Sequence, residues 1–404
     1  MKNTKNLTLP LELVLEILLL IFMDGLHKPH ENFHRLSLVC KTWRPYAQRL
    51  LFRNVRLHDP DATRGFLVAT RPDAISELSQ TLGESVRSVE MTLRSQDMLS
   101  LFSFVLRHCP KLRELSLVLY KDIDLGSLSI LSATLPQLPN VGYAELALPS
   151  IRALRISAMV EVPRFLKSAF ITWPTIRHLG LADTALEQFS THMIPESGAP
   201  GTKLPLYEVD FGPSRRGRRD PSECIRRLLQ TCGQELRILD LRGLGNATAI
   251  QNFLRESVFL AQHGAQIRSL RLAELPLHAK VHGLKACTGL EELVLYGQPP
   301  SVMREVLPLD CLVHFLYAHT PSQESYSVDR LVKWCETMPK LEVFTYVTRG
   351  QGGMIAEDAK KLASFCNAKG VRFRHKRNGI NELREELIEP TTFPRDEIIT
   401  AVWR

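Results

Sequence analysis

LRELSL, residues 112–117, is the stretch that best predicts how this chain folds. Apolar residues stand at its first, fourth and sixth positions, and the last two alternate with a polar residue, as in a strand that buries one face. The same pattern occurs ten times, at intervals of 22 to 39 residues. It starts at Val86, Leu112, Ile151, Ile176, Leu206, Leu236, Ile267, Leu290, Leu312 and Leu341.

Helical segments separate these hexapeptides. The segment DMLSLFSFVLRH (97–108) precedes LRELSL, and Pro110 ends it before the strand. One strand and one helix cannot bury an apolar face alone, so neighbouring units have to stack. We therefore predict an α/β solenoid of about ten strand–helix units. A doubly wound α/β domain is the alternative, because it also alternates helices and strands.

The third and fifth hexapeptide positions should face away from these helices, because side chains alternate along a strand. Fifth positions carry charges of both signs in the early and middle repeats and are apolar in late ones. Exposed apolar and aromatic side chains near the late repeats would make a protein-binding patch. We place this patch at Val294, Tyr296, His314 and Leu316.

The segment LPLELVLEILLLIF (9–22) is unusually apolar. It is shorter than the about 20 residues that a membrane span needs, and Glu12 and Glu16 interrupt it. The following MDGLHK is a poor signal-peptide cleavage site. If the segment is a helix, Pro10 lies near its first position, where proline is well tolerated. A helix that is apolar nearly all round has to be covered on several sides, which favours a partner protein over a membrane.

A second amphipathic segment follows at residues 33–57. Leu36, Val39, Cys40 and Trp43 form a helical stripe. A third short helix is expected between Tyr46 and Phe52, and the alternation of residues 55–57 predicts a strand after it.

LPLELVLEIL (9–18) followed by LSLVCKTWRPYAQRLLFRNVRL (36–57) resembles an F-box, particularly its fungal form. The connector at 23–34 is longer than is usual in that family. The rest of the chain is similar to the irregular leucine-rich-repeat half of F-box proteins. The resemblance implies three domains: an F-box of three helices at 1–58, a leucine-rich-repeat solenoid at 59–378, and a C-terminal cap or tail at 379–404.

The resemblance also implies a function. It predicts a non-enzymatic substrate-recognition subunit of an SCF-type cullin–RING ubiquitin ligase, which docks on a Skp-family adaptor and through it on a cullin. The repeats would hold an unknown substrate protein, with Val294, Tyr296, His314 and Leu316 as its contacts. Some of Leu9, Leu13 and Ile17 should be exposed in the isolated chain. The predicted adaptor-binding residues are Leu9, Pro10, Leu13, Ile17, Leu18, Leu38, Val39, Cys40 and Trp43.

No motif demands catalysis. The eight cysteines occur singly, without a CxxC pair, which is typical of reduced, buried thiols in the cytoplasm or nucleus. Nucleotide-binding, hydrolase and metalloprotease motifs are missing from the sequence. We therefore predict no catalytic residue, no cofactor and no metal.

The net charge of +8 comes from two short clusters. Arg215, Arg216, Arg218 and Arg219 form one, and Arg372, Arg374, Lys376 and Arg377 form the other. Without these eight residues, 43 basic residues face 43 acidic ones. A broad nucleic-acid-binding face is not implied. The alternative functions are a repeat scaffold acting outside a ligase, and a nucleic-acid-associated protein using the two clusters.

Overall fold

Among the residues that it describes, the computed structural model contains twelve parallel strands, numbered in the order of the chain. The chain divides into two compact units, Met1–Arg152 and Ala153–Arg404. The structure describes residues 43–70, 82–120, 149–158, 163–183, 204–212, 222–232, 234–244, 258–272, 282–296, 310–319, 328–348 and 356–376, and also Leu13, Ile17, Leu38, Ile250, Phe253 and Leu254.

The first unit contains strands β1 (Asn54–Leu57), β2 (Ser88–Leu93) and β3 (Glu114–Leu119), paired in that order. Its helices are α3 (Arg44–Leu51), α4 (Pro60–Ala69) and α6 (Gln96–His108). Since β1 pairs with β2, the sheet already begins inside the range 1–58 that was predicted for the F-box.

Helix α6 shows why the predicted periodicity works. The Ser95 hydroxyl caps its first turn by accepting the Met98 N–H at 3.4 Å. Met98, Phe102 and Leu106 lie four residues apart and are all buried. In the following strand β3, Leu115, Leu117 and Leu119 are buried while the alternate residues are half-buried. Helix and strand therefore share one apolar layer.

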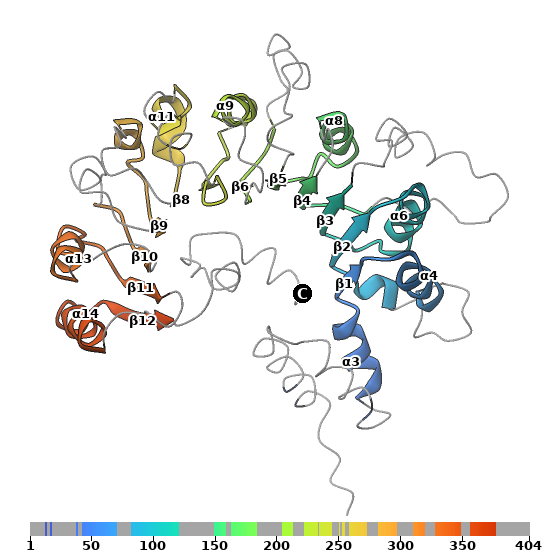
Figure 1. The fold of residues 1–404 in the computed structure, drawn as a ribbon, viewed down its shortest axis with the longest axis horizontal. Coiled ribbons are helices and arrows are strands. Elements are labelled where there is room, and N and C mark those ends of the chain that lie inside the picture. The colour runs from blue at the N-terminus through green and yellow to red at the C-terminus, as the bar shows by residue number, and fades with distance from the viewer. Residues whose placement is uncertain are drawn as a thin grey trace, which may run out of the picture. The chain divides into compact units, whose positions relative to one another are not determined.

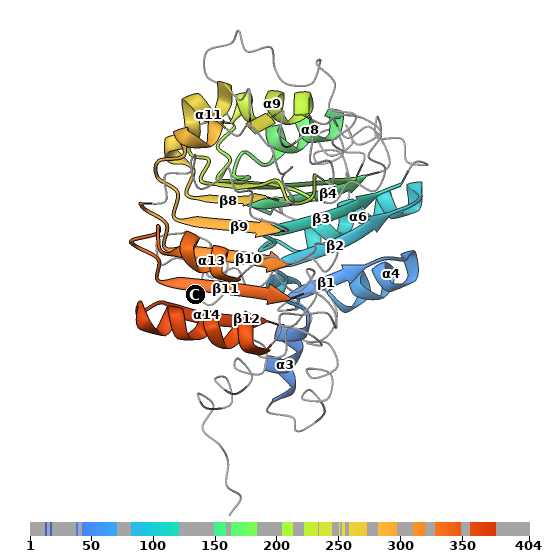
Figure 2. The ribbon, with the colours of Figure 1, turned by 60° about the vertical axis from the view of Figure 1, so that its left-hand side comes forward.

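The described residues of the second unit repeat the arrangement with the nine strands β4 to β12 (Figures 1 and 2). Its strands are β4 (Ala153–Ala158), β5 (His178–Asp183), β6 (Glu208–Phe211), β7 (Ile238–Asp240), β8 (Ser269–Leu272), β9 (Glu292–Tyr296), β10 (His314–His319), β11 (Val343–Thr348) and β12 (Arg372–Lys376). Its helices are α8 (Pro163–Thr172), α9 (Ser222–Thr231), α11 (Val258–His263), η2 (Gly264–Gln266), η3 (His282–Ala286), α13 (Val328–Cys335) and α14 (Ala356–Ala368).

The α-helices of the second unit that the structure describes lie on one face of its strands (Figure 1). We call the opposite face, which carries the third and fifth hexapeptide positions, the helix-free face. The first unit's β3 is buried on one face only, but β7, β8 and β9 are buried on both. Two-sided burial is typical of parallel strands that are covered on both faces.

All ten predicted strands are confirmed, and each begins two residues after the start of its hexapeptide. A recurring turn sets this register: the Leu112 N–H donates to the carbonyl of Cys109 at 3.0 Å, three residues earlier. The expected final strand at 371–377 is confirmed as β12. The same turn precedes the strands that follow Val86, Ile176, Ile267, Leu290 and Leu341.

Close approach of neighbouring turns makes Gly243 sensitive to substitution. A Cβ atom there would lie 2.0 Å from the Gly212 carbonyl carbon and 2.0 Å from the Phe211 oxygen. Gly243→Ala should lower the free energy of unfolding by about 1–3 kcal/mol, because backbone has to move. Denaturant titration checks this. Gly65→Ala in α4, where no atom lies within 4 Å, should instead stabilise the helix by about 1 kcal/mol.

Candidate functional site

Two surfaces predicted from the sequence can be located, the N-terminal docking residues and the helix-free face of the second unit. Leu13 and Leu38 are both helical and are 45% and 72% exposed. Ile17 is helical and half-buried, and Trp43 is half-buried just before α3. The expected exposure is confirmed for Leu13. The other predicted adaptor contacts lie outside the described residues: Leu9, Pro10, Leu18, Val39 and Cys40.

Helix α3 joins this segment to the sheet. Pro45 lies in its first turn, where a missing N–H costs no hydrogen bond, so it starts the helix instead of breaking it. Ala47 is buried, and β1 begins three residues after Leu51, the last residue of α3. Only helix α3 and two further residues separate Trp43 from the first residue of β1.

The helix-free face carries a buried polar network from β5 to β11. Its members are His178, Glu208, Asp240, Arg242, Ser269, Arg271, Glu292, Tyr296, His314 and Thr345.

Arg271 is the centre of this network and is 2% exposed. Its Nε and Nη2 atoms donate to Glu292 Oε1 at 3.0 and 2.9 Å. Its Nη1 atom lies 3.6 Å from Asp240 Oδ2 and 3.7 Å from Glu208 Oε1. One guanidinium from β8 therefore faces carboxylates from three other strands. Because these side chains are buried, solvent screens their charges less than it would at the surface.

Glu292 is a buried carboxylate with several hydrogen-bond partners. Besides Arg271, its Oε1 accepts the Ser269 hydroxyl at 2.5 Å, and its Oε2 lies 3.1 Å from His314 Nδ1. The other ring nitrogen of His314 lies 3.2 Å from the Thr345 hydroxyl. Burial alone would raise the pKa of Glu292, but Arg271 and these hydrogen bonds hold that pKa well below its ordinary value.

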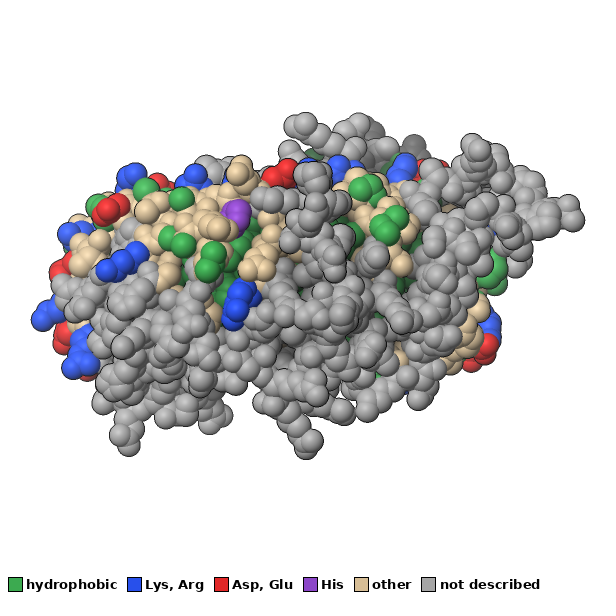
Figure 3. All heavy atoms as spheres, turned by 90° about the horizontal axis from the view of Figure 1, so that it is seen from above, with side chains coloured by type: hydrophobic (Ala, Val, Ile, Leu, Met, Phe, Trp, Pro, Cys, Tyr) green, Lys and Arg blue, Asp and Glu red, His purple; other side chains and the backbone are tan. Residues whose placement is uncertain are grey.

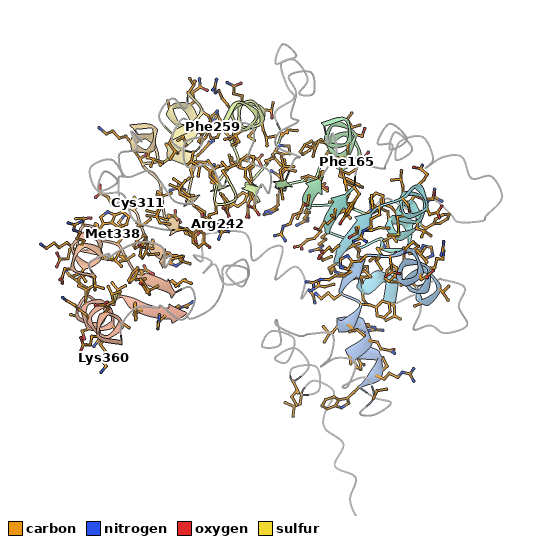
Figure 4. All side chains as sticks on the ribbon, in the orientation of Figure 1. Phe165, Arg242, Phe259, Cys311, Met338 and Lys360 are labelled. Carbon is orange, nitrogen blue, oxygen red and sulfur yellow. The ribbon has the colours of Figure 1, made fainter. Side chains whose placement is uncertain are left out.

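Arg242 follows β7 and extends the network on the side of the strands opposite Phe259 of α11 (Figure 4). It forms a forked pair with Asp240, including a bond from Nε to Oδ1 at 2.9 Å, and its Nη1 donates to the Tyr296 hydroxyl at 2.6 Å. Burial would lower the pKa of Arg242, but Asp240 raises it above its ordinary value. Burial raises the pKa of Tyr296.

The predicted patch of late repeats requires a correction. Val294, His314 and Leu316 are no more than 1% exposed, and Tyr296 is 7% exposed. They face away from the helices, as their positions predict, but they are buried. His314 is held between Glu292 and Thr345. The three others pack with Ala318 and Val347 in what we call the late apolar cluster. Their assignment to substrate binding stays a prediction, although the expected exposure is wrong.

Arginines at the second hexapeptide position are a feature that the sequence reasoning missed. Arg87 Nη1 donates to the carbonyls of Glu84 and Val86, and Arg237 Nη1 donates to that of Gln234 at 2.8 Å. These bonds satisfy turn carbonyls that precede the strands. The signal was present in the printed sequence, because six of the ten hexapeptides have this residue: Arg87, Arg113, Arg152, Arg177, Arg237 and Arg268.

The row of arginines continues to Arg53, which precedes β1 and is buried. Burial, together with the charges of Arg87 and Arg113, lowers the pKa of Arg53 to about 10. The backbone carbonyl at this position also links repeats: that of Arg87 accepts the N–H groups of Arg113 and Glu114, both at 2.9 Å. Tyr207 and Glu291 make the same backbone contacts with their next repeats, so these contacts do not depend on an arginine side chain.

The buried cysteine thiols of the described residues are protonated. Burial raises the pKa of the Cys109, Cys232 and Cys287 thiols to about 12, which keeps them protonated and poorly nucleophilic. Within the described ranges, no group of three or more His, Cys, Asp or Glu side chains is placed to hold a metal ion. In the view of Figure 3, acidic, basic and apolar side chains of the described residues are interspersed. Arg215, Arg216, Arg218 and Arg219 lie outside the described ranges.

Comparison with known proteins finds no protein-family model that matches the chain and no curated protein that is similar to it. Among the helices of the described residues, none has the length and apolar character needed to cross a membrane.

Proposed function

We propose that this chain is the substrate-recognition subunit of an SCF-type cullin–RING ubiquitin ligase. In this proposal, residues 1–58 form an F-box that docks on a Skp-family adaptor, and the strand–helix units form a leucine-rich-repeat solenoid. The subunit itself is not a catalyst. It holds a substrate protein beside the ligase, so that transfer of ubiquitin is promoted by proximity.

The exposure of Leu13 and Leu38 is the observation that carries the proposal. Large apolar side chains in a helical segment that remain exposed in the isolated chain are typical of a surface that a partner covers. Their sequence context, LPLELVLEIL and LSLVCKTW, resembles an F-box on both sides of the connector. The parallel strands follow one another in chain order, and the same turn precedes six of the ten predicted strands, as is expected of a stack of repeats.

Loss of adaptor binding tests the proposal. We expect the full-length chain to bind a purified Skp-family adaptor, and Leu38→Asp to weaken binding at least about tenfold, because a buried charge would replace an apolar contact. Leu13→Asp should act in the same direction. Isothermal titration calorimetry measures both affinities.

Ile171→Asp is the matched control, because Ile171 of α8 is also 72% exposed but lies outside the docking segment. It should bind the adaptor as the unmodified chain does. The proposal fails if the unmodified chain does not bind, or if Ile171→Asp loses as much affinity as Leu38→Asp.

A further inference from the structure

Four arginines stand side by side along one edge of the first unit, and we call them the arginine ladder: Arg53, Arg87, Arg113 and Arg152. Each lies one residue before a strand. The backbone joins them in series, because the N–H groups of Arg87, Arg113 and Arg152 each donate to the carbonyl of the preceding member, at 2.9, 2.9 and 2.8 Å. Neighbouring side chains therefore leave the backbone about 4.8 Å apart.

Stacking of the repeats does not explain why these residues are arginines. Tyr207 and Glu291 make the same backbone contacts at the equivalent position. Turn carbonyls engage one nitrogen of Arg87, since its Nη1 donates to the carbonyls of Glu84 and Val86. Among the residues that the structure describes, the Nε and Nη2 atoms of Arg87 have no hydrogen-bond partner. The turn therefore orients this guanidinium, and its other N–H groups are the donors that a ligand would use.

Positive charge is in excess along the ladder. The four residues that end at each ladder member contain, in total, five basic and two acidic side chains. The acidic ones are Glu84 and Glu114, and Lys111 already lies 2.9 Å from Glu84. Burial and the charges of neighbouring arginines lower the pKa of Arg53 to about 10 and also lower that of Arg87. A bound anion would offset this repulsion.

The arginines of the second unit differ in this respect. Two of its three second-position arginines have a carboxylate partner: Arg177 pairs with Glu235, and Arg268 Nη1 lies 3.4 Å from Glu291. The same residue type at the same hexapeptide position is therefore largely neutralised within the protein in the second unit. These two arginines provide a matched control for the ladder.

A phosphate group is the anion that suits this arrangement. A guanidinium presents parallel N–H donors that match two phosphate oxygens, and a phosphate group bound to a side chain offers three free oxygens and nearly two charges. Guanidinium groups from neighbouring strands can share these oxygens, whereas one fork is enough for a carboxylate. The ladder has only four members, and a nucleic-acid backbone would need a more extended basic surface.

We propose that the arginine ladder is a binding site for a phosphate group, with Arg87 and Arg113 as hydrogen-bond donors and Arg53 as a buried charge beside them. The phosphate belongs either to a phosphorylated side chain of another protein or to free phosphate, since both present the same oxygens. The inference does not depend on the adaptor or on a ligase.

Isothermal titration calorimetry of the full-length chain tests the proposal with inorganic phosphate, with a glycine-rich pentapeptide that carries one phosphoserine, and with its unphosphorylated form. We expect the first two to bind and the third not to. Arg87→Met/Arg113→Met should weaken binding at least about tenfold, because charge-assisted hydrogen bonds are lost. A phosphopeptide that binds more tightly than inorganic phosphate identifies a modified protein as the source, and equal affinities identify free phosphate.

Arg177→Met/Arg268→Met is the control and should leave the affinity for phosphate unchanged. Labelling of the unmodified chain with the arginine reagent phenylglyoxal gives a readout that needs no variant. Saturating phosphate should slow the modification of Arg87 and Arg113 at least about fivefold at constant ionic strength, while Arg268 is modified as before.

Three results would overturn the proposal. The first is that neither phosphate probe binds or protects Arg87 and Arg113 from phenylglyoxal. The second is that the control variant Arg177→Met/Arg268→Met loses as much affinity as Arg87→Met/Arg113→Met. The third is that a single-stranded oligonucleotide binds more tightly than the phosphopeptide and depends on the ladder, because the ladder would then contact a nucleic-acid backbone.

Discussion

Replacing Arg271 with methionine is expected to lower the free energy of unfolding by about 3–5 kcal/mol, because it leaves buried carboxylates without their shared cation. Arg271 is 2% exposed and lies within 3.7 Å of Glu208, Asp240 and Glu292. Methionine fills a similar volume, so the loss would report charge and hydrogen bonding more than packing. Urea or guanidinium titration at pH 7 measures it.

The effect of pH gives this prediction a second readout. In the unmodified protein the pKa of Glu292 is lowered below its ordinary value of 4.5. Glu292 therefore contributes stability above that value and loses it as the pH falls through the folded-state pKa. Without Arg271, burial should dominate and raise the pKa of Glu292. The variant should then lose stability as the pH rises above 4.5, and the difference from the unmodified protein should shrink in acid.

Arg56→Met is the matched control for Arg271→Met. Arg56 also forms an ion pair between neighbouring strands, with Glu90 at 3.4 Å, but its side chain is 68% exposed. Its replacement should cost less than about 1 kcal/mol. If Arg271→Met costs no more than Arg56→Met, the network does not stabilise the fold.

The sequence was sufficient to predict the strands because their signal is local. Each hexapeptide places apolar residues at positions four and six, and Leu115 and Leu117 of β3 are buried as this pattern requires. Helix α6 ends at His108, before Pro110, as expected. The turn from Cys109 to Leu112 was not predicted, but the register that it fixes was.

The environment of the helix-free face was not predictable in the same way. Position alternation correctly places Asp240, Arg271 and Val294 on one face, but it says nothing about what covers that face. Exposure was expected because these positions face away from the helices. Arg271 and Glu292 come from different repeats, 21 residues apart, so their pairing depends on strand register and not on a sequence motif.

An aromatic ladder gives the second large expected effect. Most repeats have leucine at the fourth hexapeptide position, but β10, β11 and β12 have Phe315, Phe344 and Phe373 in register. Phe315 is fully buried, with its ring centroid 5.4 Å from that of Phe344 and 4.8 Å from that of Trp334 on α13. The ladder therefore joins the sheet to a covering helix through rings in stacked and edge-on contact.

Phe315→Ala should lower the free energy of unfolding by about 3–5 kcal/mol, because it removes a whole ring and leaves a cavity beside two others. Phe315→Leu introduces the residue that β9 has at the equivalent position, Leu293, and should cost about 1–1.5 kcal/mol. Denaturant titration of both variants separates lost volume from lost aromatic contact.

Phe104→Ala is the control, because Phe104 on α6 is 43% exposed and its truncation should cost less than about 1 kcal/mol. Equal losses for Phe315→Ala and Phe104→Ala would show that the ladder does not contribute specifically to stability. A Phe315→Leu loss as large as that of Phe315→Ala would mean that ring contacts with Phe344 and Trp334, and not filled volume, hold the late repeats together.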